Sequence, residues 1–549
     1  MSAPARRVPP SAWLLTLLVL GLLGLWGWRE IGLQSRERAD GGRVESRTVA
    51  GWPDLEGDSL FSAGRETLTP EEQGVLVAKL RARLGSEWVR SGEAILTFRD
   101  EAAYRRFLAR AMHAGAELTG RIDGLLAVRV RVRDYARLIE EMAENIADYV
   151  SVSANTLVTT PPPPKEQRAE GEVRPVEGGL LGLIEARGDA RERGRGVLIA
   201  ILDGGVAPDA AFGARLRYLD IGYGVVGLAE DTRHGTAVAA IAAGAAPDVP
   251  GVAPAAELLS IRVFGPDGKS DAFSVAQGIV AAVDAGARVI NLSLGGYATV
   301  QVLGSAVDYA LADGVALVAA SGNDQVERVA WPAAYPGVVS VGAVDAGGRQ
   351  ALFSNSGETL QLTAPGVGVR TVAAGGGRFL FSGTSASAPV VAGSLAALLS
   401  QNPELDAIQA ADLLVQYSND AGVAGTDPDF GRGIVNLGWA LERATPSRVD
   451  PALATQDYDA GTRTLTFVVQ NRSGRAVGDL RVAVRVGTKD YQASLPELAA
   501  GEATRVKIHL ESALSDAETP VKATLLLPPG MLDQNTANNE LRGLIRGRP

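Results

Sequence analysis

The sequence predicts an α/β domain with a mostly parallel sheet flanked by helices, between a small α+β domain and an all-β sandwich. The apolar run Val197–Leu202 ends in Asp-Gly-Gly, which is typical of a buried parallel strand followed by a tight turn. Residues 69–158 mix short helical and strand patterns, whereas residues 449–549 alternate at period two between Gly, Asn and Pro turns. The length of 549 residues and the 46% apolar content are sufficient for several hydrophobic cores.

The composition excludes some partners and some chemistry. The net charge is −10 and no basic stripe is present, which argues against a nucleic-acid partner. The chain contains no cysteine. Disulfide bonds, a cysteine protease, a thiolate metal site and a lipidated N-terminal cysteine are therefore excluded.

The first 28 residues predict an export segment. Arg6 and Arg7 precede an apolar run from Trp13 to Trp28, which is near the lower length limit for a membrane-spanning helix. No Ala-x-Ala-like site ends this run, which favours an uncleaved signal anchor over residues 1–28 rather than a removed signal peptide. A buried soluble helix is a further alternative, but the run is apolar all round. We expect a single membrane pass through this helix, a cytoplasmic N-terminus and an extracytoplasmic chain at the cell envelope.

A polar, Arg/Glu-rich tether is expected over residues 29–68, followed by a small domain over residues 69–158. Thr69-Pro-Glu-Glu72 predicts a capping box that opens a helix ending at Leu84. The βαββα(β) order of the patterns predicts a ferredoxin-like α+β fold. Strands are expected at Glu93–Phe98, Leu126–Val132 and Tyr149–Val152, and helices at Ala102–Ala114 and Tyr135–Ala147.

A Pro-rich linker is expected over residues 159–178. It begins with Thr159-Thr-Pro161-Pro-Pro-Pro164 and continues with charged residues. Such a composition predicts a semi-rigid, exposed segment, where proteolytic processing is easiest.

The central region places an aspartate, a histidine and a serine beside predicted buried elements. Asp203 ends the apolar strand, and active sites of open α/β sheets lie at that carboxyl edge. His234 and Ser385 each lie in a short Gly- and Thr-containing motif that opens a helix of small apolar residues. A nucleophile at a helix N-terminus has backbone N–H groups nearby that can stabilise an oxyanion.

These three residue types together favour nucleophilic catalysis by serine. A serine hydroxyl is a poor nucleophile at neutral pH, so it needs an imidazole to take its proton and a carboxylate to orient that imidazole. His113 and His509 lie outside the central region, which leaves His234 as its one conventional imidazole base. The chain order Asp, His, Ser is the order found in subtilisin.

Residues from about 180 to 445 resemble the subtilisin-like (subtilase) serine protease family. The three motifs above carry the resemblance together with Asn291–Gly296, Val315–Asn323 and Gly431–Asn436. The resemblance implies a subtilisin-like protease domain over residues 179–446, with a mostly parallel sheet flanked by helices.

The resemblance also implies the catalytic roles of an endopeptidase that hydrolyses peptide bonds through an acyl-enzyme. Ser385 is expected to attack the carbonyl carbon, His234 to transfer the proton, and Asp203 to orient His234. Asn323 and the backbone N–H of Ser385 are expected to stabilise the oxyanion.

Protein or peptide substrates are expected to add to the domain as an extended strand, held by main-chain hydrogen bonds. By resemblance, Lys269–Asp271 supplies one edge of the groove. Gly295 and Gly322 have no side chains that would obstruct the first pocket for a substrate side chain. Alternatively, these glycines serve turns and close packing. The residues expected to bind substrate are Ser293, Leu294, Gly295, Ser321 and Gly322.

The position of residues 69–158 resembles that of the subtilase propeptide, which is both an intramolecular chaperone and an inhibitor. This implies a self-processing zymogen whose partners include its own propeptide. A cut near Ala154–Thr160 would leave the anchor with the propeptide and release the protease. The alternative is an unrelated sensing or spacer domain.

The C-terminal residues 449–549 predict an antiparallel β-sandwich. Asp533–Asn539 resembles the closing segment of adhesion-type immunoglobulin-like domains, which implies either binding of cell-surface material or of another domain, or a passive stabilising module. Strands are expected at Thr464–Val469, Leu480–Val486, Thr504–Leu510 and Val521–Leu527.

No cofactor is expected to be required for the chemistry, and no metal site stands out. Structural calcium is left open by the resemblance, with Asp427, Asp429 or the turn at Ala333–Pro336 as contributors. An alternative to the whole interpretation is a catalytically silent, subtilase-shaped module that binds a protein at the cell envelope.

Overall fold

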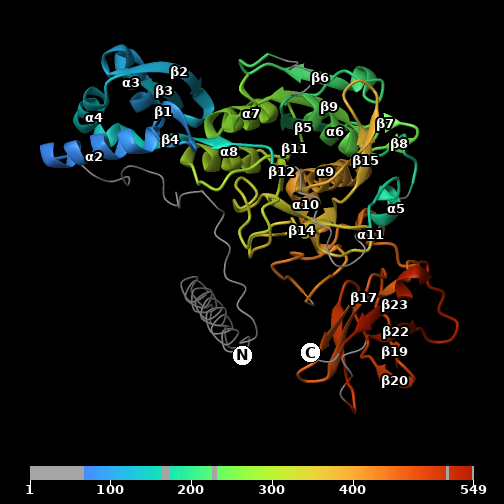
Figure 1. The fold of residues 1–549 in the computed structure, drawn as a ribbon. Helices are drawn as coiled ribbons and strands as arrows, with labels where there is room; N and C mark the ends of the chain where they lie inside the picture. The colour runs from blue at the N-terminus through green and yellow to red at the C-terminus, as the bar shows by residue number, and fades with distance from the viewer. Residues whose placement is uncertain are drawn as a thin grey trace, which may run out of the picture. The chain divides into compact units, whose positions relative to one another are not determined.

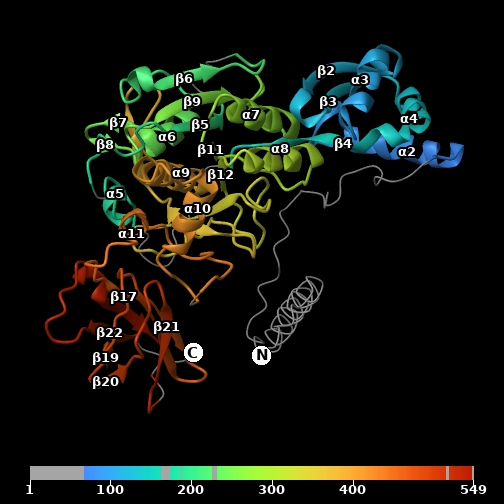
Figure 2. The same cartoon turned by 180° about the vertical axis from the view of Figure 1, so that it is seen from behind.

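A computed structural model of the chain describes residues 67–161, 174–186, 188–224, 232–423, 425–512, 514 and 518–546. The predicted anchor over residues 1–28 and the tether up to residue 66 lie outside the described residues. Within the described ranges, none of the helices combines the length and the apolar composition that crossing a membrane requires. The described chain forms an N-terminal α+β unit, a central α/β unit and a C-terminal β unit (Figures 1 and 2).

The N-terminal unit is an antiparallel sheet in the order β4-β1-β3-β2, with two helices between its strands and one helix before them. The capping box predicted at Thr69 is confirmed, because Glu72 accepts from the Thr69 N–H and Thr69 Oγ1 accepts from the Glu72 N–H. The strand β2 was missed by the sequence analysis. The elements are α2 (Pro70–Leu84), β1 (Val89–Phe98), α3 (Glu101–Arg110), β2 (Ala116–Ile122), β3 (Ala127–Val132), α4 (Tyr135–Glu144) and β4 (Tyr149–Val158).

The central unit is built on a seven-stranded parallel sheet in the order β14-β13-β12-β11-β5-β9-β6, so the predicted α/β fold with a parallel sheet is confirmed. The strands are β5 (Leu198–Asp203), β6 (Leu216–Leu219), β9 (Glu257–Arg262), β11 (Val289–Leu292), β12 (Ala316–Ala320), β13 (Val339–Val344) and β14 (Leu362–Pro365). The main helices are α6 (Thr232–Ala243), α7 (Ala272–Asp284), α8 (Gln301–Ala312), α9 (Thr384–Gln401) and α10 (Ala407–Gln416). Shorter elements are α5 (Leu180–Leu183), β7 (Ala245–Ala246), β8 (Val249–Pro250), β15 (Val369–Val372), β16 (Arg378–Phe381) and α11 (Leu437–Glu442).

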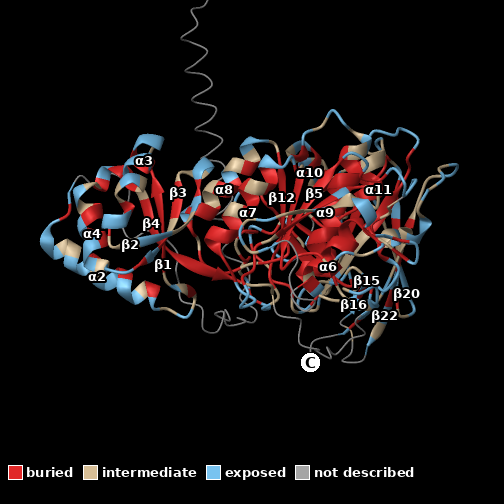
Figure 3. Cartoon of the chain, turned by 90° about the horizontal axis from the view of Figure 1, so that it is seen from above, coloured by how far each residue is buried: buried red, intermediate tan, exposed pale blue. Residues whose placement is uncertain are grey.

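Both faces of this parallel sheet are covered, as the continuous apolar run of β5 predicts. Ile199 and Ile201 pack with α6 and α9 on one face, whereas Leu198, Ala200 and Leu202 pack with α7 and α8 on the other. Figure 3 shows the buried strands β5 and β12 lying among these helices. The sheet is therefore a rigid support, and the carboxyl ends of its strands carry the polar residues described below.

The C-terminal unit packs a three-stranded sheet, β17-β18-β21, against a four-stranded sheet, β20-β19-β22-β23. The four predicted strands correspond to β18, β19, β21 and β22, whereas β17, β20 and β23 were missed. The strands are β17 (Pro451–Asp459), β18 (Thr464–Asn471), β19 (Arg481–Val486), β20 (Lys489–Ser494), β21 (Ala503–His509), β22 (Thr519–Leu526) and β23 (Glu540–Ile545).

The N-terminal and central units share a sheet. The short strand β10 (Ser270–Asp271) of the central unit pairs antiparallel with the end of β4, and the sheet order becomes β10-β4-β1-β3-β2. Ser270 lies opposite Val158, and Asp271 lies opposite Leu157. The last residues of β4 therefore extend beyond their own unit and pair with the central unit.

Candidate active site

Asp203 is the last residue of β5 and has a buried side chain, 1% exposed. One carboxylate oxygen, Oδ1, accepts from the N–H of Gly204 at 2.7 Å, and the other, Oδ2, lies 2.8 Å from Nδ1 of His234. A carboxylate only accepts, so Nδ1 of a neutral His234 carries the hydrogen and Nε2 is the acceptor nitrogen. This arrangement suits Nε2 to take a proton.

His234 lies in the first turn of α6, as predicted. The next residue must be glycine because a Cβ at Gly235 would lie 2.3 Å from the carbonyl oxygen of Gly205 and 3.0 Å from Cβ of Asp203. This close approach brings α6 against the end of β5. The imidazole packs edge-to-face on Phe381, with ring centroids 5.4 Å apart, and its Nε2 is buried with no hydrogen-bond partner among the described residues.

Ser385 lies in the first turn of α9 and is 2% exposed. Gly383 before the helix has φ +141°, so the chain enters α9 through a bend that side chains rarely allow. Ser385 Oγ donates to the carbonyl oxygen of Ser293 at 3.4 Å, and Ser293 Oγ donates to the carbonyl oxygen of Ser385 at 3.1 Å. Ser293 and Ser385 are therefore direct neighbours.

Asn323 follows β12 and faces the start of α9. Its Oδ1 accepts from the N–H of Thr384 at 2.9 Å and from Thr384 Oγ1 at 2.8 Å. A Cβ at Gly383 would lie 3.0 Å from Asn323 Nδ2, so this amide group lies against the residue two before Ser385. With Oδ1 held by Thr384, Asn323 presents Nδ2 as its donor near the N-terminus of α9.

The five predicted substrate-binding residues lie at two loops beside Ser385, but not all contribute side chains. Leu294 is fully buried in the core, so its side chain is not available to a substrate. Ser321 Oγ donates to the carbonyl oxygen of Asn355, and a Cβ at Gly322 would lie 2.3 Å from Asn355 Nδ2. Packing against Asn355 is therefore a structural reason for glycine at position 322.

The groove between Gly295 and β10 contains an extended segment of the chain itself. Thr159 donates its N–H to the carbonyl oxygen of Gly295 at 3.1 Å and accepts from the Gly295 N–H at 2.9 Å. On its other side, the same segment pairs through Leu157 and Val158 with β10. Thr159, which the sequence analysis assigned to the exposed linker, thus lies in the groove as a strand between the two predicted edges.

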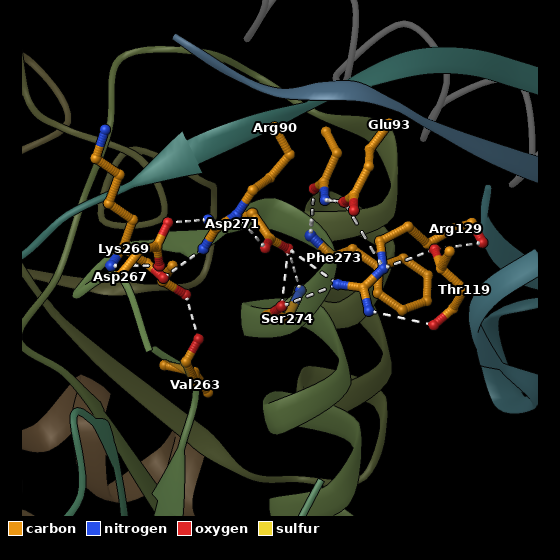
Figure 4. A network of polar contacts seen from close by, with 12 residues as sticks. Arg90, Glu93, Thr119, Arg129, Val263, Asp267, Lys269, Asp271, Phe273 and Ser274 are labelled. Atoms are coloured by element: carbon orange, nitrogen blue, oxygen red, sulfur yellow. Dashed lines mark hydrogen bonds and ion pairs between the residues drawn. The ribbon is translucent and has the colours of Figure 1, made fainter. Parts of the chain in front are cut away.

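A polar network fixes the N-terminal unit beside this groove (Figure 4). Arg90 Nε donates to Asp271 Oδ2 at 3.1 Å, and its Nη groups reach Asp267 and the carbonyl oxygen of Lys269. Arg129 lies 3.8 Å from Asp271 Oδ1 and stacks over the Phe273 ring at 5.0 Å. The side chains of Arg90 and Arg129 thus extend from the N-terminal unit to β10 and lie over the start of α7.

The comparisons with known proteins place the central unit in a family. Residues 194–433 match the family described as Peptidase_S8, the subtilase family. Subtilisin BL of Lederbergia lenta is 36% identical over 247 residues, which are 44% of this chain and 90% of that protein. The chain belongs to the subtilase family.

Two further relatives extend the comparison. Alkaline elastase YaB of Bacillus sp. (strain YaB) is 36% identical over 245 residues, which are 44% of this chain and 64% of that protein, so the match covers less than two thirds of its length. The crystal structure of fervidolysin from Fervidobacterium pennivorans, described as a keratinolytic enzyme related to subtilisin, covers 83% of this chain and 76% of its own. Its TM-score is 0.54 at 20% identity, which shows a shared fold. This subtilase is a subtilisin-like serine endopeptidase.

One residue of the subtilase site was missed by the sequence analysis. Asn355 is fully buried, and its Oδ1 accepts from the N–H groups of Asp324 and Val326. Its Nδ2 donates to Tyr297 Oη, to the carbonyl oxygen of Ser321 and to that of Arg328. Asn355 therefore holds the loop that carries Asn323 from both ends. The Ser-Asn-Ser-Gly turn around it was the available signal, although such a turn is common in loops.

Several residues considered for calcium already take part in hydrogen bonds within the chain. Asp427 Oδ1 accepts from the N–H groups of Asp429 and Phe430, and its Oδ2 accepts from the N–H of Val423. Tyr335 Oη donates to the carbonyl oxygen of Val300. Among the residues that the structure describes, no group of three or more His, Cys, Asp or Glu side chains could hold a metal ion.

Proposed function

We propose that this subtilase is an exported, self-inhibited zymogen that hydrolyses protein or peptide substrates with Ser385 as nucleophile, His234 as general base and Asp203 as the residue that orients His234. The observation that carries the proposal is the extended segment Leu157–Thr159, which is hydrogen-bonded at both edges of the groove beside Ser385. A groove that holds one peptide as a strand can hold another in the same way.

The chemical steps follow from the positions of the side chains. Ser385 Oγ attacks the substrate carbonyl carbon while Nε2 of His234 takes the hydroxyl proton. Asp203 keeps the hydrogen on Nδ1 and stabilises the imidazolium that forms. The oxyanion receives hydrogen bonds from Nδ2 of Asn323 and the backbone N–H of Ser385, and the leaving amine then takes the proton from His234. Water hydrolyses the resulting acyl-enzyme by the same route.

The N-terminal unit acts as the propeptide in this proposal. Its antiparallel β4-β1-β3-β2 order with helices between the strands fits a ferredoxin-like domain, and its β4 ends in the groove. Residues 1–28 are proposed to anchor this precursor in the membrane, with the protease outside the cytoplasm. Release of the protease then requires a cut between the N-terminal unit and residue 179.

The C-terminal sandwich is proposed to be an immunoglobulin-like domain that is firmly joined to the protease. Arg448 between the two is 1% exposed. Its guanidinium lies 2.6 Å from Asp450 Oδ2, 3.1 Å from Glu185 Oε2 and 2.5 Å from Glu442 Oε2. A buried guanidinium that contacts three carboxylates joins the sandwich to the protease, which supports a stabilising role.

A fluorophosphonate label tests the catalytic proposal. The full chain is nicked in the linker with immobilised trypsin, for which Lys165 and Arg168 are sites, and is then labelled. We expect label on wild type, none on Ser385→Ala, and normal labelling of Ser394→Ala, a buried hydroxyl further along the same helix. A nicked wild-type chain that takes no label and cleaves no peptide would leave the silent binding module instead.

A further inference from the structure

We propose that the hydroxyl of Ser293 replaces a helix N–H that Pro389 lacks, and that it thereby holds the carbonyl group of Ser385 in position. Asn291 orients this hydroxyl. Ser293 and Asn291 are therefore positioning residues for the nucleophile, in addition to the substrate-binding role expected for Ser293. This inference rests on the proposed function, because it takes Ser385 as the nucleophile.

Proline at position 389 leaves the Ser385 carbonyl without its helix donor. In an α-helix, each carbonyl oxygen accepts from the N–H four residues later, so position 389 is the one that would donate to Ser385. Pro389 lies inside α9 and has no N–H. Its ring also crowds the carbonyl group of the residue four positions earlier. The Ser385 carbonyl therefore needs a donor from outside the regular pattern of α9.

The hydroxyl of Ser293 supplies a donor at this point. Ser293 is fully buried, and its Oγ donates to the carbonyl oxygen of Ser385 at 3.1 Å. In the opposite direction, Ser385 Oγ donates to the carbonyl oxygen of Ser293 at 3.4 Å. The two serines are thus joined by a pair of hydrogen bonds, one from each hydroxyl to the backbone of the other residue.

Asn291 fixes the direction of the Ser293 hydroxyl. It is fully buried, and its Nδ2 donates to Ser293 Oγ at 3.0 Å. A hydroxyl has one hydrogen, and with an N–H group facing its oxygen that hydrogen is left for the Ser385 carbonyl. The other amide atom, Oδ1, is buried without a hydrogen-bond partner among the described residues. Because such an atom is costly to bury, this amide is better suited to orienting the hydroxyl than to adding stability.

The backbone that carries Asn291 is held on both sides. Its strand, β11, lies between β5 and β12, and Asn291 is opposite Ile201 of β5 and Val318 of β12. Ser293 lies just beyond the end of this strand. The Ser385 carbonyl is therefore bonded to a part of the chain that has little freedom to move.

The consequence for catalysis is a nucleophile whose backbone is held both before and after it. Asn323 Oδ1 accepts from the N–H of Thr384, and Ser293 Oγ donates to the carbonyl oxygen of Ser385. Between these two bonds lie the Ser385 N–H, which is proposed to stabilise the oxyanion, and the Oγ, which is proposed to attack. A displacement of about 1 Å can cost ~100-fold in rate, so loss of the Ser293 hydroxyl should lower kcat more than it affects substrate binding.

A double-mutant cycle between positions 293 and 389 tests this role. Ser293→Ala removes the hydroxyl, whereas Pro389→Ala restores an N–H that can donate to the Ser385 carbonyl from within the helix. With the trypsin-nicked enzyme and a peptide substrate, we expect Ser293→Ala to lower kcat by ~10- to 100-fold with KM little changed, and to slow fluorophosphonate labelling by a similar factor. Ser293→Ala/Pro389→Ala should recover the kcat of Pro389→Ala, because the helix N–H then replaces the hydroxyl.

The matched control is Ser394→Ala, because Ser394 Oγ also donates to a carbonyl oxygen of α9, that of Val390. It should leave kcat unchanged in either background at position 389. Asn291→Ala is a second variant that leaves the Ser293 hydroxyl in the protein. It should lower kcat by itself and should cost nothing further in the Ser293→Ala background. The urea midpoint of each variant shows that it is folded.

Three results would overturn the inference. A Ser293→Ala enzyme with the kcat and labelling rate of wild type would show that the hydroxyl is not needed to hold Ser385. A loss that persists in full in the Pro389→Ala background, or that appears in KM alone, would assign the hydroxyl another role. An unchanged kcat for Asn291→Ala would reject its effect on Ser293. All three leave the proposed function standing, whereas a nicked wild type that takes no fluorophosphonate label would reject the proposed function itself.

Discussion

Arg90 Nε and Asp271 Oδ2 lie 3.1 Å apart, and this ion pair joins the N-terminal unit to the residue that caps helix α7. The Asp271 side chain is 1% exposed and the Arg90 side chain is 20% exposed. Asp271 also accepts from the N–H of Ser274. The same carboxylate therefore caps α7 of the protease and pairs with Arg90 of the N-terminal unit.

Replacing Arg90 by Met should weaken the binding of the N-terminal unit at the groove. Loss of one partner from a buried charge pair costs about 2–5 kcal/mol, and even the lower figure corresponds to a factor of ~30. In the full chain, the rate of fluorophosphonate labelling of Ser385 should therefore rise about 30-fold or more. Arg105→Met removes an exposed pair with Glu101 in the same unit and should leave the rate unchanged. Equal labelling rates for Arg90→Met and wild type would contradict this role of Arg90.

Asn355→Ala should lower kcat through its effect on Asn323. Removing an oxyanion donor lowers kcat by about 10²–10³. Asn323→Ala should show a loss of this size with KM little changed, and it is the reference for the loss in kcat caused by Asn355→Ala. If Asn355 acts only by holding Asn323, the double variant Asn323→Ala/Asn355→Ala should be no slower than Asn323→Ala. The trypsin-nicked enzyme and a peptide substrate provide the measurement. Additive losses in kcat would assign Asn355 a separate role.

Asp148 should contribute acid-sensitive stability to the N-terminal unit. Hydrogen bonds from Arg106 and then Arg110 hold the pKa of Asp148 below its ordinary value despite partial burial. A lowered folded-state pKa gives stability that is present above the unfolded pKa of about 3.9 and is lost as the pH falls through the folded pKa. Asp148→Asn should therefore increase amide exchange in β4 at pH 6, and its difference from wild type should shrink below about pH 4.

The matched control for Asp148 is Glu101→Gln, which removes an exposed carboxylate that pairs with Arg105 in the same unit. Exposed pairs contribute about 0–1 kcal/mol, so exchange in β4 should stay as in wild type. A difference between Asp148→Asn and wild type that stays constant from pH 6 to below pH 4 would rule out titration of Asp148 as its source.

Arg448→Met should destabilise the joint between protease and sandwich. The change removes the guanidinium that pairs with the buried carboxylate of Asp450 and with Glu185, and breaking a buried ion pair costs about 3–5 kcal/mol. We expect a lower urea midpoint for the full chain. Arg485→Met breaks an exposed pair with Asp490 and should change the midpoint little. An unchanged midpoint for Arg448→Met would show that the buried cluster contributes no net stability.

Much of the candidate site could be predicted from the sequence because its residues lie directly at the ends of strongly patterned elements. Asp203 ends a continuous apolar strand, and His234 and Ser385 lie in the first turns of helices made of small residues. The patterns are local, and the geometry of a parallel sheet brings their ends together.

Other features could not be predicted, because they depend on contacts between distant parts of the chain. Asn355 holds Ser321 and Arg328 across a turn, and Arg90 reaches Asp271 from a different unit. The strands β2, β17, β20 and β23 were missed because they are rich in polar residues or contain a glycine and show only weak alternation. They form by pairing with better-patterned neighbours.

The pairing of Leu157–Thr159 with both sides of the groove has a consequence for solubility. Ser270–Asp271 and Gly295 present unpaired backbone N–H and C=O groups whenever the groove is empty, and open strand edges of this kind are templates on which separate chains join into aggregates. While the segment is in place, these donors and acceptors are satisfied within one molecule. The hydrogen bonds that hold this segment in the groove therefore also keep neighbouring copies from joining edge to edge.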